Sequence, residues 1–581
     1  MSSTAVSSPS PTCEPAAEGG SQPSLAERLQ SWCGLFSTAD GVRGRLALML
    51  SCVLPMLIVA ALHGVVVQPA EPVFYGDENR HVMTGVFFAD MLSDMPVGNP
   101  KTYAEQYYLQ YPALGLLVWP PLFHFIEGLL MTVCGTSFLV GRIAVAGFAV
   151  LAGVYFFRLM AKTHDRLSAS VALVWFGLCP LIFMFSRQVM LEIPTLAWSL
   201  MAVFHFERYL ESTRRRDLVL IALAAAAAAL TRFDAIWLLP CFGLLLLARR
   251  KLHLLRRVEV WIAIVGAVLL VLPFYALAAR EVGALHSRQA THSVMSEPAG
   301  FLAAKNFAFY LRMLPHQIGW LLVGLAVVGL SRLRRWDWLQ QNVPYLAIAL
   351  ATYATFTPIA ELDVRHSIYW IPAFVVMAWN GVTELARGRL RPYLRPAIAA
   401  LVVGVMTSAA LTAPRPTLSG YREAAEWVLK NSPNESRFLF DGWLDGNFSY
   451  HVRNLDPARQ HAVLRGDKLL YGFICVPSTD LHEYAKTDRD IMDVIYRYDP
   501  AFVVVEDPQP KQVVATALRL RQVLREHPDR YRLEHTVAVT GESDRIGGYS
   551  LLIYRNLHRN PDPDARVKFE VLGLNRTVGA D

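Results

Sequence analysis

A series of long apolar runs dominates this chain of 581 residues and decides its fold class. A membrane-spanning helix needs about 20 mostly apolar residues, and about eleven runs come near that length, the shorter ones through tilt or buried polar residues. Hydrophobic residues make up 54% of the chain and charged residues only 18%, whereas soluble domains are about one quarter charged. We therefore predict a polytopic α-helical membrane protein, with spans at approximately 46–68, 138–160, 167–186, 193–210, 218–232, 235–249, 258–279, 317–331, 343–358, 368–385 and 397–413.

The basic residues predict how the chain is threaded through the membrane. Short cytoplasmic loops carry an excess of Lys and Arg, and the basic loops here share one side only if the apolar run at 113–134 does not cross. That run contains Pro120, Pro121, His124 and Glu127, so we predict an interfacial helix on the outer face. The N-terminus is then cytoplasmic and the C-terminus lies outside. The basic loops are 162–166, 214–216, 249–257, 332–335 and 387–395.

Composition divides the chain into three parts. Residues 1–42 are rich in Ser, Pro, Ala and Gly, which predicts a disordered cytoplasmic tail. Residues 43–413 form the predicted transmembrane domain. Residues 414–581 form a predicted soluble, extracytoplasmic α/β domain, because helical and strand patterns alternate there. The expected helices are 421–430 and 512–525, and the expected strands are 437–440, 502–505 and 549–554.

Several function classes are excluded by the same patterns. The net charge of +7 comes from the short loops between apolar runs, so we predict no nucleic-acid partner. The seven cysteines include no Cys-x-x-Cys pair, which argues against a zinc site. No phosphate loop and no dinucleotide fingerprint occurs in the polar C-terminal region. We therefore predict no metal and no other cofactor.

Charged side chains beside the predicted spans are the candidate functional residues, because a charge near lipid is costly without a partner or a task. Asp77 and Glu78 follow the first span, on the outer side of the membrane. The same threading also places four further charged residues on the outer side of the membrane, namely Arg187, Glu192, Arg232 and Arg365. Each group has a structural alternative: a helix cap at Asp77 and Glu78, an ion pair of Arg187 with Glu192, a salt bridge of Arg232 with Asp234, and pairing of Arg365 with Glu361 or Asp363.

The order of these features along residues 45–410 resembles the GT-C superfamily of membrane glycosyltransferases. The nearest group is the one related to protein O-mannosyltransferases and aminoarabinose transferases. Two positions depart from the family pattern: Trp119 stands where relatives carry Lys or His, with His124 close by, and Glu192 replaces the commoner Asp. The matching segments are Asp77-Glu78, Trp119-Pro120-Pro121-Leu122, Gly141-Arg142, Ser186-Arg187 with Leu191-Glu192-Ile193-Pro194, Leu230-Thr231-Arg232, and Arg365-His366 before Tyr369-Trp370-Ile371-Pro372.

The resemblance implies an enzyme of the plasma membrane that transfers a sugar, with inversion, from a polyprenyl-phosphate donor. The sugar would be mannose, another hexose or a pentose, and the acceptor a protein, lipid or glycan on the outer face. Asp77 would be the base. The remaining roles implied are further catalytic carboxylates at Glu78 and Glu192, and phosphate binding by Arg187, Arg232, Arg365 and His124.

Two other functions remain open from the sequence. Charges that face outward within a helix bundle also suit a transporter or lipid flippase, although the chain shows none of the paired halves common in transporters. A metal-dependent enzyme of the oligosaccharyltransferase kind would instead use Asp77 and Glu192 as oxygen ligands of a divalent ion. No Asp-x-Asp element lies near residue 192, which makes this alternative the weaker one.

Overall fold

A computed structural model describes residues 57, 77–282, 301–387, 391–413, 418–472, 481–508, 514–541, 548–564, 568–571 and 576–578. By its internal contacts the chain divides into Met1–Leu50 and Ser51–Asp581, and the fold below concerns the second part. The predicted tail at 1–42 lies outside the described residues. So does the first predicted span at 46–68, except for Leu57.

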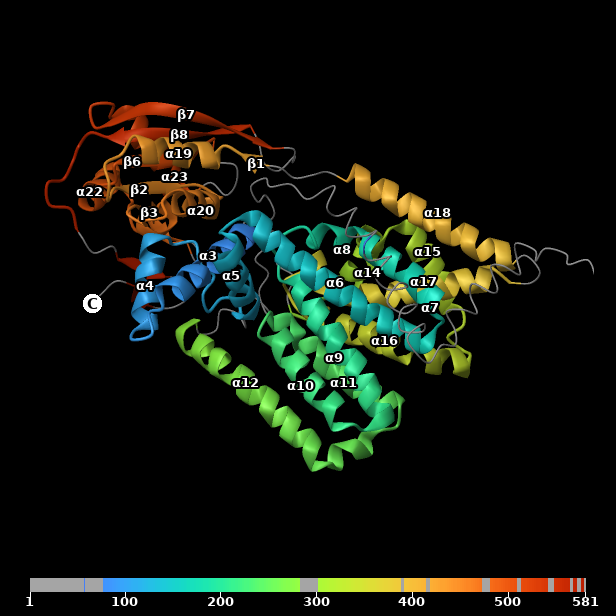
Figure 1. Cartoon of the computed structure of the whole chain (residues 1–581). Helices are drawn as coiled ribbons and strands as arrows, with labels where there is room; N and C mark the ends of the chain where they lie inside the picture. The colour runs from blue at the N-terminus through green and yellow to red at the C-terminus, as the bar shows by residue number, and fades with distance from the viewer. Residues whose placement is uncertain are drawn as a thin grey trace, which may run out of the picture. The chain divides into compact units, whose positions relative to one another are not determined.

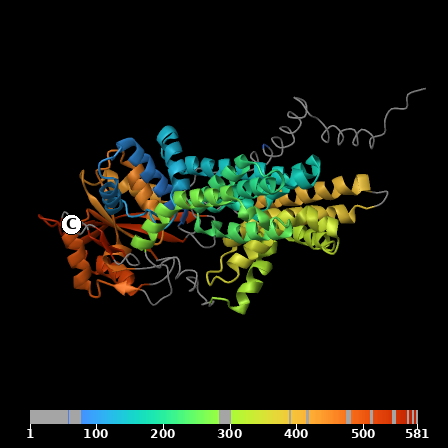
Figure 2. The same cartoon turned by 90° about the horizontal axis from the view of Figure 1, so that it is seen from below.

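The described residues between 77 and 412 form helices and loops, apart from one isolated bridge between Leu116 and Trp119 (Figures 1 and 2). Each predicted span other than the first coincides with a helix or with two consecutive helices. The α-helices are α3 (Asp77–Asp94), α4 (Pro100–Gln110), α5 (Leu122–Cys134), α6 (Phe138–Thr163), α7 (Arg166–Leu178), α8 (Pro180–Phe185), α9 (Glu192–Ser212), α10 (Arg215–Ala229), α11 (Leu238–Ala248), α12 (Val258–Val282), α14 (Ala304–Ile318), α15 (Trp320–Leu330), α16 (Trp336–Phe356), α17 (Ile371–Leu385) and α18 (Arg391–Thr412). Three 3₁₀ helices join them: η1 (Phe233–Trp237), η2 (Leu252–Arg256) and η3 (Val364–Trp370).

Among the described residues, three helices are long and apolar enough to cross a membrane, namely α6, α12 and α18. The pair α14 and α15 would make a fourth if it is one span, but it bends by 118°. Length and apolarity alone therefore identify fewer spans among the described residues than the eleven predicted from the sequence. One reason is local: the predicted span at 167–186 breaks before Pro180, which opens α8 and has no backbone N–H to continue α7.

The apolar run at 113–134 does not form one long helix. Only α5 is helical, and its 13 residues extend about 20 Å at 1.5 Å per residue. This is shorter than the hydrocarbon core of a bilayer, which is about 30 Å thick. The helix in this run is therefore too short to span a bilayer by itself, and the interfacial position of the run stays a prediction. An unpredicted helix, α14, ends at Gly319, whose φ of 83° lies in the left-handed region that glycine tolerates.

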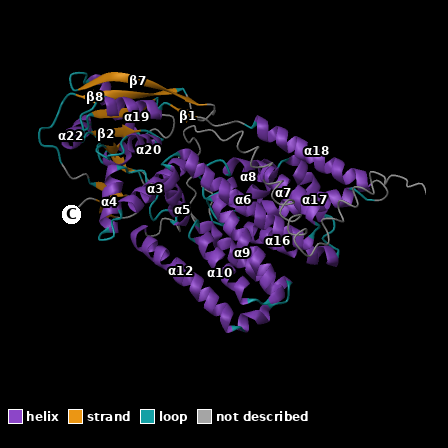
Figure 3. Ribbon diagram, viewed as in Figure 1, coloured by secondary structure: helices purple, strands orange, loops and turns teal. Residues whose placement is uncertain are grey.

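The C-terminal part contains a six-stranded sheet in the order β1-β7-β8-β6-β2-β3, and the strands are confined to this part of the described chain (Figure 3). β2 pairs in parallel with β3 and β6, whereas β8 pairs antiparallel with β6 and β7. The predicted strands at 437–440, 502–505 and 549–554 are present as β2, β6 and β8. The sheet consists of β1 (Leu418–Ser419), β2 (Arg437–Asp441), β3 (Ala462–Arg465), β6 (Phe502–Asp507), β7 (Tyr531–Gly541) and β8 (Tyr549–Asn556).

Helices and two small ladders complete this part. The predicted helices are present as α19 and α23, whereas α20, α21 and α22 were not predicted. The helices are α19 (Tyr421–Lys430), α20 (Asp445–Leu455), α21 (Gly466–Leu469), α22 (Asp488–Tyr498) and α23 (Ala515–Glu526). The ladders pair β4 (Tyr471–Gly472) with β5 (His482–Glu483) and β9 (Phe569–Val571) with β10 (Arg576–Val578).

Candidate active site

Three distant segments bring an aspartate, a glutamate and an arginine together. Asp77 is the first residue of α3, and its Oδ2 accepts a hydrogen bond of 3.0 Å from Nη1 of Arg365 in η3. Nε of Arg365 lies 3.9 Å from Oε1 of Glu192, the first residue of α9. Arg365 thus lies between the carboxylates of Asp77 and Glu192.

A second arginine extends this network. Nη1 of Arg232 donates to Oε1 of Glu192 at 2.5 Å, and its Nε donates to Oδ2 of Asp234 at 2.6 Å. Arg365 has the corresponding near neighbour, because its Nε lies 3.1 Å from Oδ2 of Asp363. We call the whole set the carboxylate–guanidinium cluster; it consists of Asp77, Glu192, Arg232, Asp234, Asp363 and Arg365.

The side chains of the cluster differ in exposure. The Asp77 side chain is 24% exposed and that of Arg365 18%, whereas Arg232 is 9% exposed and Glu192 is fully buried. Buried charges are tolerated only when ion pairs and hydrogen bonds replace water. Glu192 is therefore held by its partners, whereas Asp77 has the most exposed side chain of the cluster.

Glu78 lies next to Asp77 but makes a separate set of contacts. It is 1% exposed, and its Oε1 accepts from Nε of Arg142 at 3.2 Å and from the backbone N–H of Val189 at 3.0 Å. These contacts tie α3 to α6 and to the loop before α9. A buried carboxylate already bonded in this way is suited to fixing α3 in place.

His124 pairs with His81 rather than with an arginine. Nδ1 of His81 and Nε2 of His124 are 2.9 Å apart, and both side chains are 1% exposed. Burial lowers the pKa of His124 to about 4 and lowers that of His81 well below its usual 6.5. The charges of Arg232 and Arg365 also lower the pKa of His81, which places His81 close to the cluster. At neutral pH the histidine pair therefore carries no charge.

Arg187 makes local contacts. Its guanidinium carbon lies 4.2 Å from the centre of the Phe183 ring, and its Nε donates to the Phe183 carbonyl at 3.0 Å. This stacking holds Arg187 against α8, a few residues before Glu192 in the chain. Its predicted role in phosphate binding stays a prediction.

Sequence reasoning treated Asp234 and Asp363 only as local partners of the arginines. The structure shows that each arginine does two things at once: it bonds the aspartate two residues away and also reaches a distant carboxylate. The sequence signal for this double role is the mirrored spacing of the two pairs, Arg-x-Asp at 232–234 and Asp-x-Arg at 363–365. His81 was missed because a lone histidine inside a helix carries no such signal.

The described residues contain no group of three or more His, Cys, Asp or Glu side chains arranged to hold a metal ion. Two arginines are interleaved with the acidic side chains of the cluster, which is the composition of an ion-pair network. The network thus places carboxylates beside guanidinium groups.

The comparisons with known proteins can be set beside this geometry. A family model described as dolichyl-phosphate-mannose-protein mannosyltransferase matches residues 118–276, which include Glu192 and Arg232. No curated protein matches the chain. The resemblance predicted from the sequence motifs is confirmed at the level of the fold by three solved structures.

These structures come from two proteins, each 13% identical to this chain. ArnT from Cupriavidus metallidurans bound to undecaprenyl phosphate has a TM-score of 0.55, and the match covers 88% of this chain and 99% of that one. The same ArnT in the apo state has a TM-score of 0.56, with 86% and 97% covered. The arabinofuranosyltransferase AftD from Mycobacteria has a TM-score of 0.53, with 92% of this chain and 41% of that chain covered.

Proposed function

We propose that this chain, which has the fold of the GT-C membrane glycosyltransferases, transfers a sugar from a polyprenyl-phosphate donor to an acceptor hydroxyl outside the cytoplasm. One observation carries the proposal. Asp77 lies 3.0 Å from Arg365, 288 residues later, so that a partly exposed carboxylate adjoins guanidinium groups. The ArnT structure with undecaprenyl phosphate supports a lipid phosphate as ligand, because it shares this fold.

In the proposed reaction Asp77 is the base. It takes the proton from the acceptor hydroxyl while that oxygen attacks the anomeric carbon from the face opposite the phosphate. The new glycosidic bond forms as the bond between the anomeric carbon and the phosphate oxygen breaks, and polyprenyl phosphate leaves with the bonding electrons. A positioned base of this kind contributes a rate factor of about 10²–10⁴.

The arginines would stabilise the charge that develops on the leaving phosphate. A guanidinium group binds phosphate oxygens in pairs, and Arg365 is the more exposed of the two cluster arginines. We propose that the donor phosphate competes with Asp77 for Arg365 and so releases Asp77 to accept a proton. Glu192 would hold Arg232 and Arg365 in register from the buried side. Arg187 is a further candidate for the phosphate because it adjoins α9.

The proposed compartment follows from the threading. The helix of Asp77 contacts the C-terminal domain, so the active face and that domain would share the extracytoplasmic side of the plasma membrane. A cysteine introduced by Arg519→Cys, at an exposed position of α23, should react with a membrane-impermeant thiol reagent in intact cells. Reaction only after lysis would contradict the threading.

The test of function uses the purified full chain with a panel of polyprenyl-phosphate sugars, including mannose, other hexoses and pentoses. We expect Asp77→Asn to lower kcat by about 10²–10⁴-fold, while donor binding is retained because Arg232 and Arg365 remain. Asp488→Asn, which removes an exposed carboxylate of α22, is the matched control and should leave kcat unchanged. Full turnover by a folded Asp77→Asn protein would refute the role of the base.

The same purified protein distinguishes the proposed function from the two alternatives that the sequence left open, a flippase and a metal-dependent transferase. Movement of the lipid across reconstituted vesicles without cleavage of the sugar–phosphate bond would identify a flippase. Loss of turnover in the presence of a chelator, restored by a divalent ion, would identify a metal-dependent transferase. Either result would replace the proposal.

A further inference from the structure

The C-terminal domain contacts the same helical turn that carries Asp77. Nδ2 of Asn79 donates to Oδ1 of Asn447 at 2.8 Å, and Nη2 of Arg80 lies 3.5 Å from Oδ1 of Asp445. Asn79 is 2% exposed and Asn447 is fully buried. A Cβ atom at Gly446 would overlap the Asn79 side chain, so only glycine lets α20 approach this closely. The first turns of α3 and α20 are therefore packed against each other.

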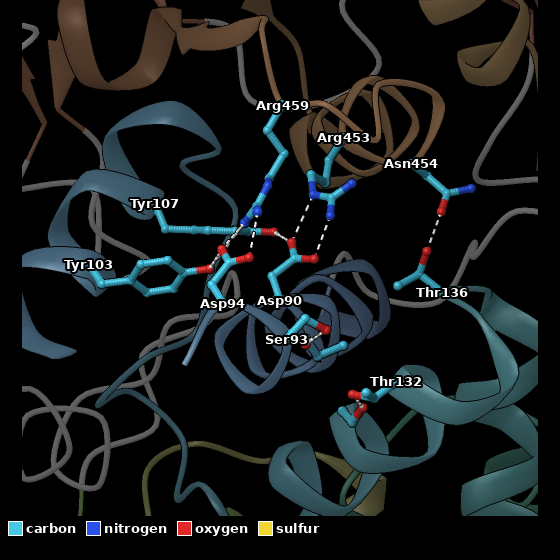
Figure 4. Close-up of polar contacts among 12 residues, drawn as sticks. Asp90, Ser93, Asp94, Tyr103, Tyr107, Thr132, Thr136, Arg453, Asn454 and Arg459 are labelled. Atoms are coloured by element: carbon cyan, nitrogen blue, oxygen red, sulfur yellow. Dashed lines mark hydrogen bonds and ion pairs between the residues drawn. The ribbon is translucent and has the colours of Figure 1, made fainter. Parts of the chain in front are cut away.

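The far ends of the two helices are joined as well (Figure 4). Arg453 donates to both oxygens of Asp90, at 2.8 Å from Nε and 2.5 Å from Nη2. Arg459 in the same way contacts Asp94 through two nitrogens, at 2.5 and 2.7 Å. Asp90 and Arg453 are both less than 9% exposed. Bidentate hydrogen bonds between charged groups are among the stronger hydrogen bonds in proteins, and they also fix the relative orientation of the two side chains.

These contacts occur in the same order along both segments. Asn79 meets Asn447, Asp90 meets Arg453, and Asp94 meets the loop after α20. The fifteen steps from residue 79 to 94 span about 22 Å along a helix axis. A helix held at both ends over this distance can neither slide along its neighbour nor rotate against it. Since Asp77 begins α3, the contacts with α20 help to fix its position, together with those of Glu78 and Arg365.

Helix α20 is in turn anchored to the sheet. The buried Glu506 on β6 accepts hydrogen bonds from the backbone N–H groups of Trp443 at 2.7 Å and Leu444 at 3.1 Å. Its carboxylate also accepts from the Tyr421 hydroxyl at 2.5 Å. A Cβ atom at Gly442 would overlap Glu506. The loop that starts α20 is thus held rigidly, and through it the sheet supports α3.

We propose that the C-terminal domain is part of the active site: α20, through Asn447 and Gly446, positions Asp77 for its task. This inference rests on the proposed function of Asp77. Asn447 and Gly446 are positioning residues, because their contacts are with Asn79, two residues from Asp77. A domain that only shielded the site or only bound the acceptor would not need to hold the catalytic helix at both ends.

The first readout is independent of catalysis. We expect Asn447→Ala and Gly446→Ala, each in the full chain, to speed hydrogen exchange of the backbone amides in the first two turns of α3. Gly404→Ala in α18 is the matched control, because a Cβ there meets nothing within 4 Å, and it should leave this exchange unchanged. If neither C-terminal variant alters exchange in α3, the proposal is overturned.

The second readout is kinetic. A small misplacement of a catalytic group can cost up to about 10²-fold in rate, so we expect kcat to fall by about 10- to 100-fold with an unchanged KM for the donor. Faster exchange in α3 with normal kcat would overturn the proposal, as would a rise in KM alone. An inactive parent protein would refute the proposed function, while the exchange data would still decide whether α20 holds α3. If the Gly446→Ala protein does not fold, the Asn447→Ala protein still tests the proposal.

Discussion

Each arginine of the carboxylate–guanidinium cluster bonds one near and one distant carboxylate. Arg232 reaches Asp234 and Glu192, and Arg365 reaches Asp363 and Asp77. A guanidinium group can do this because its planar fork presents five donors in fixed directions, whereas an ammonium group offers a single point charge. The near aspartate orients the guanidinium group, and the oriented guanidinium group in turn fixes the position of the distant carboxylate.

At this scale the structure predicts a loss of stability for Arg232→Gln. Asp234 would lose its partner Arg232, and Glu192 would keep only the more distant Arg365, 3.9 Å away. Removing one partner of a buried ion pair costs about 3–5 kcal/mol. The free energy of unfolding, measured by denaturation in detergent, should fall by this amount. Arg519→Gln is the control: its ion pair with Asp488 is 43% and 42% exposed, and exposed pairs contribute about 0–1 kcal/mol. Equal losses for both variants would contradict this prediction.

At the scale of elements, the sequence predicted apolar helices and several strands with their bounds shifted by a few residues. It missed α14 and α3, because α14 mixes polar and apolar residues and α3 begins with an acidic pair that is equally typical of a loop. It missed α20 and β7 for a similar reason: their burial is decided by neighbours far away in the chain. The convergence of Asp77, Glu192 and Arg365 could be expected from the resemblance, but the pairing of Asn79 with Asn447 could not.

Helices α15 and α17 give a prediction about packing. A Cβ at Gly329 would overlap the Met377 carbonyl oxygen, and one at Gly381 would overlap that of Leu325, so the two helix backbones touch. Small residues at such contacts let apolar helices associate closely. Gly329→Ala should therefore force the helices apart and lower the unfolding free energy by about 1–3 kcal/mol.

The control for this variant lies on the same helix. Gly324→Ala adds a methyl group where nothing lies within 4 Å, so it should leave the unfolding free energy within about 0.5 kcal/mol of the parent. Since Ala favours a helix more than Gly does, a destabilisation by Gly324→Ala as large as that of Gly329→Ala would show that close packing of α15 against α17 does not set the effect.

At the scale of the whole described molecule, ionised carboxylates join the C-terminal domain to α3 and α4. The hydrogen bond from Arg459 lowers the pKa of Asp94. Burial alone would raise the pKa of Asp467, but Arg465 outweighs it and brings the pKa to about 2. Arg465 also donates to the Pro112 carbonyl at 2.5 Å, so this ion pair belongs to the same contact.

The sign of the pH dependence follows from these lowered values. A carboxyl group whose pKa is lower in the folded state stabilises that state above its ordinary pKa of 3.8, and the contribution is lost as the pH falls toward about 2. Unfolding temperatures should therefore be steady near neutrality and drop below about pH 4. Asp94→Asn should weaken this acid sensitivity, whereas Asp493→Asn, at a side chain 66% exposed, should preserve it. A stability that rose on acidification would contradict the assignment.

The pairing of Asn79 with Asn447 joins residues 368 positions apart, and this has a consequence for biosynthesis. Ribosomes make α3 early, whereas its docking partner Asn447 is made only after α18 and the first two strands of the C-terminal sheet. A nascent or truncated copy would therefore already hold the arginines and still lack a properly placed base. On the proposed function, unfinished copies in the membrane would leave the lipid-linked sugar pool untouched.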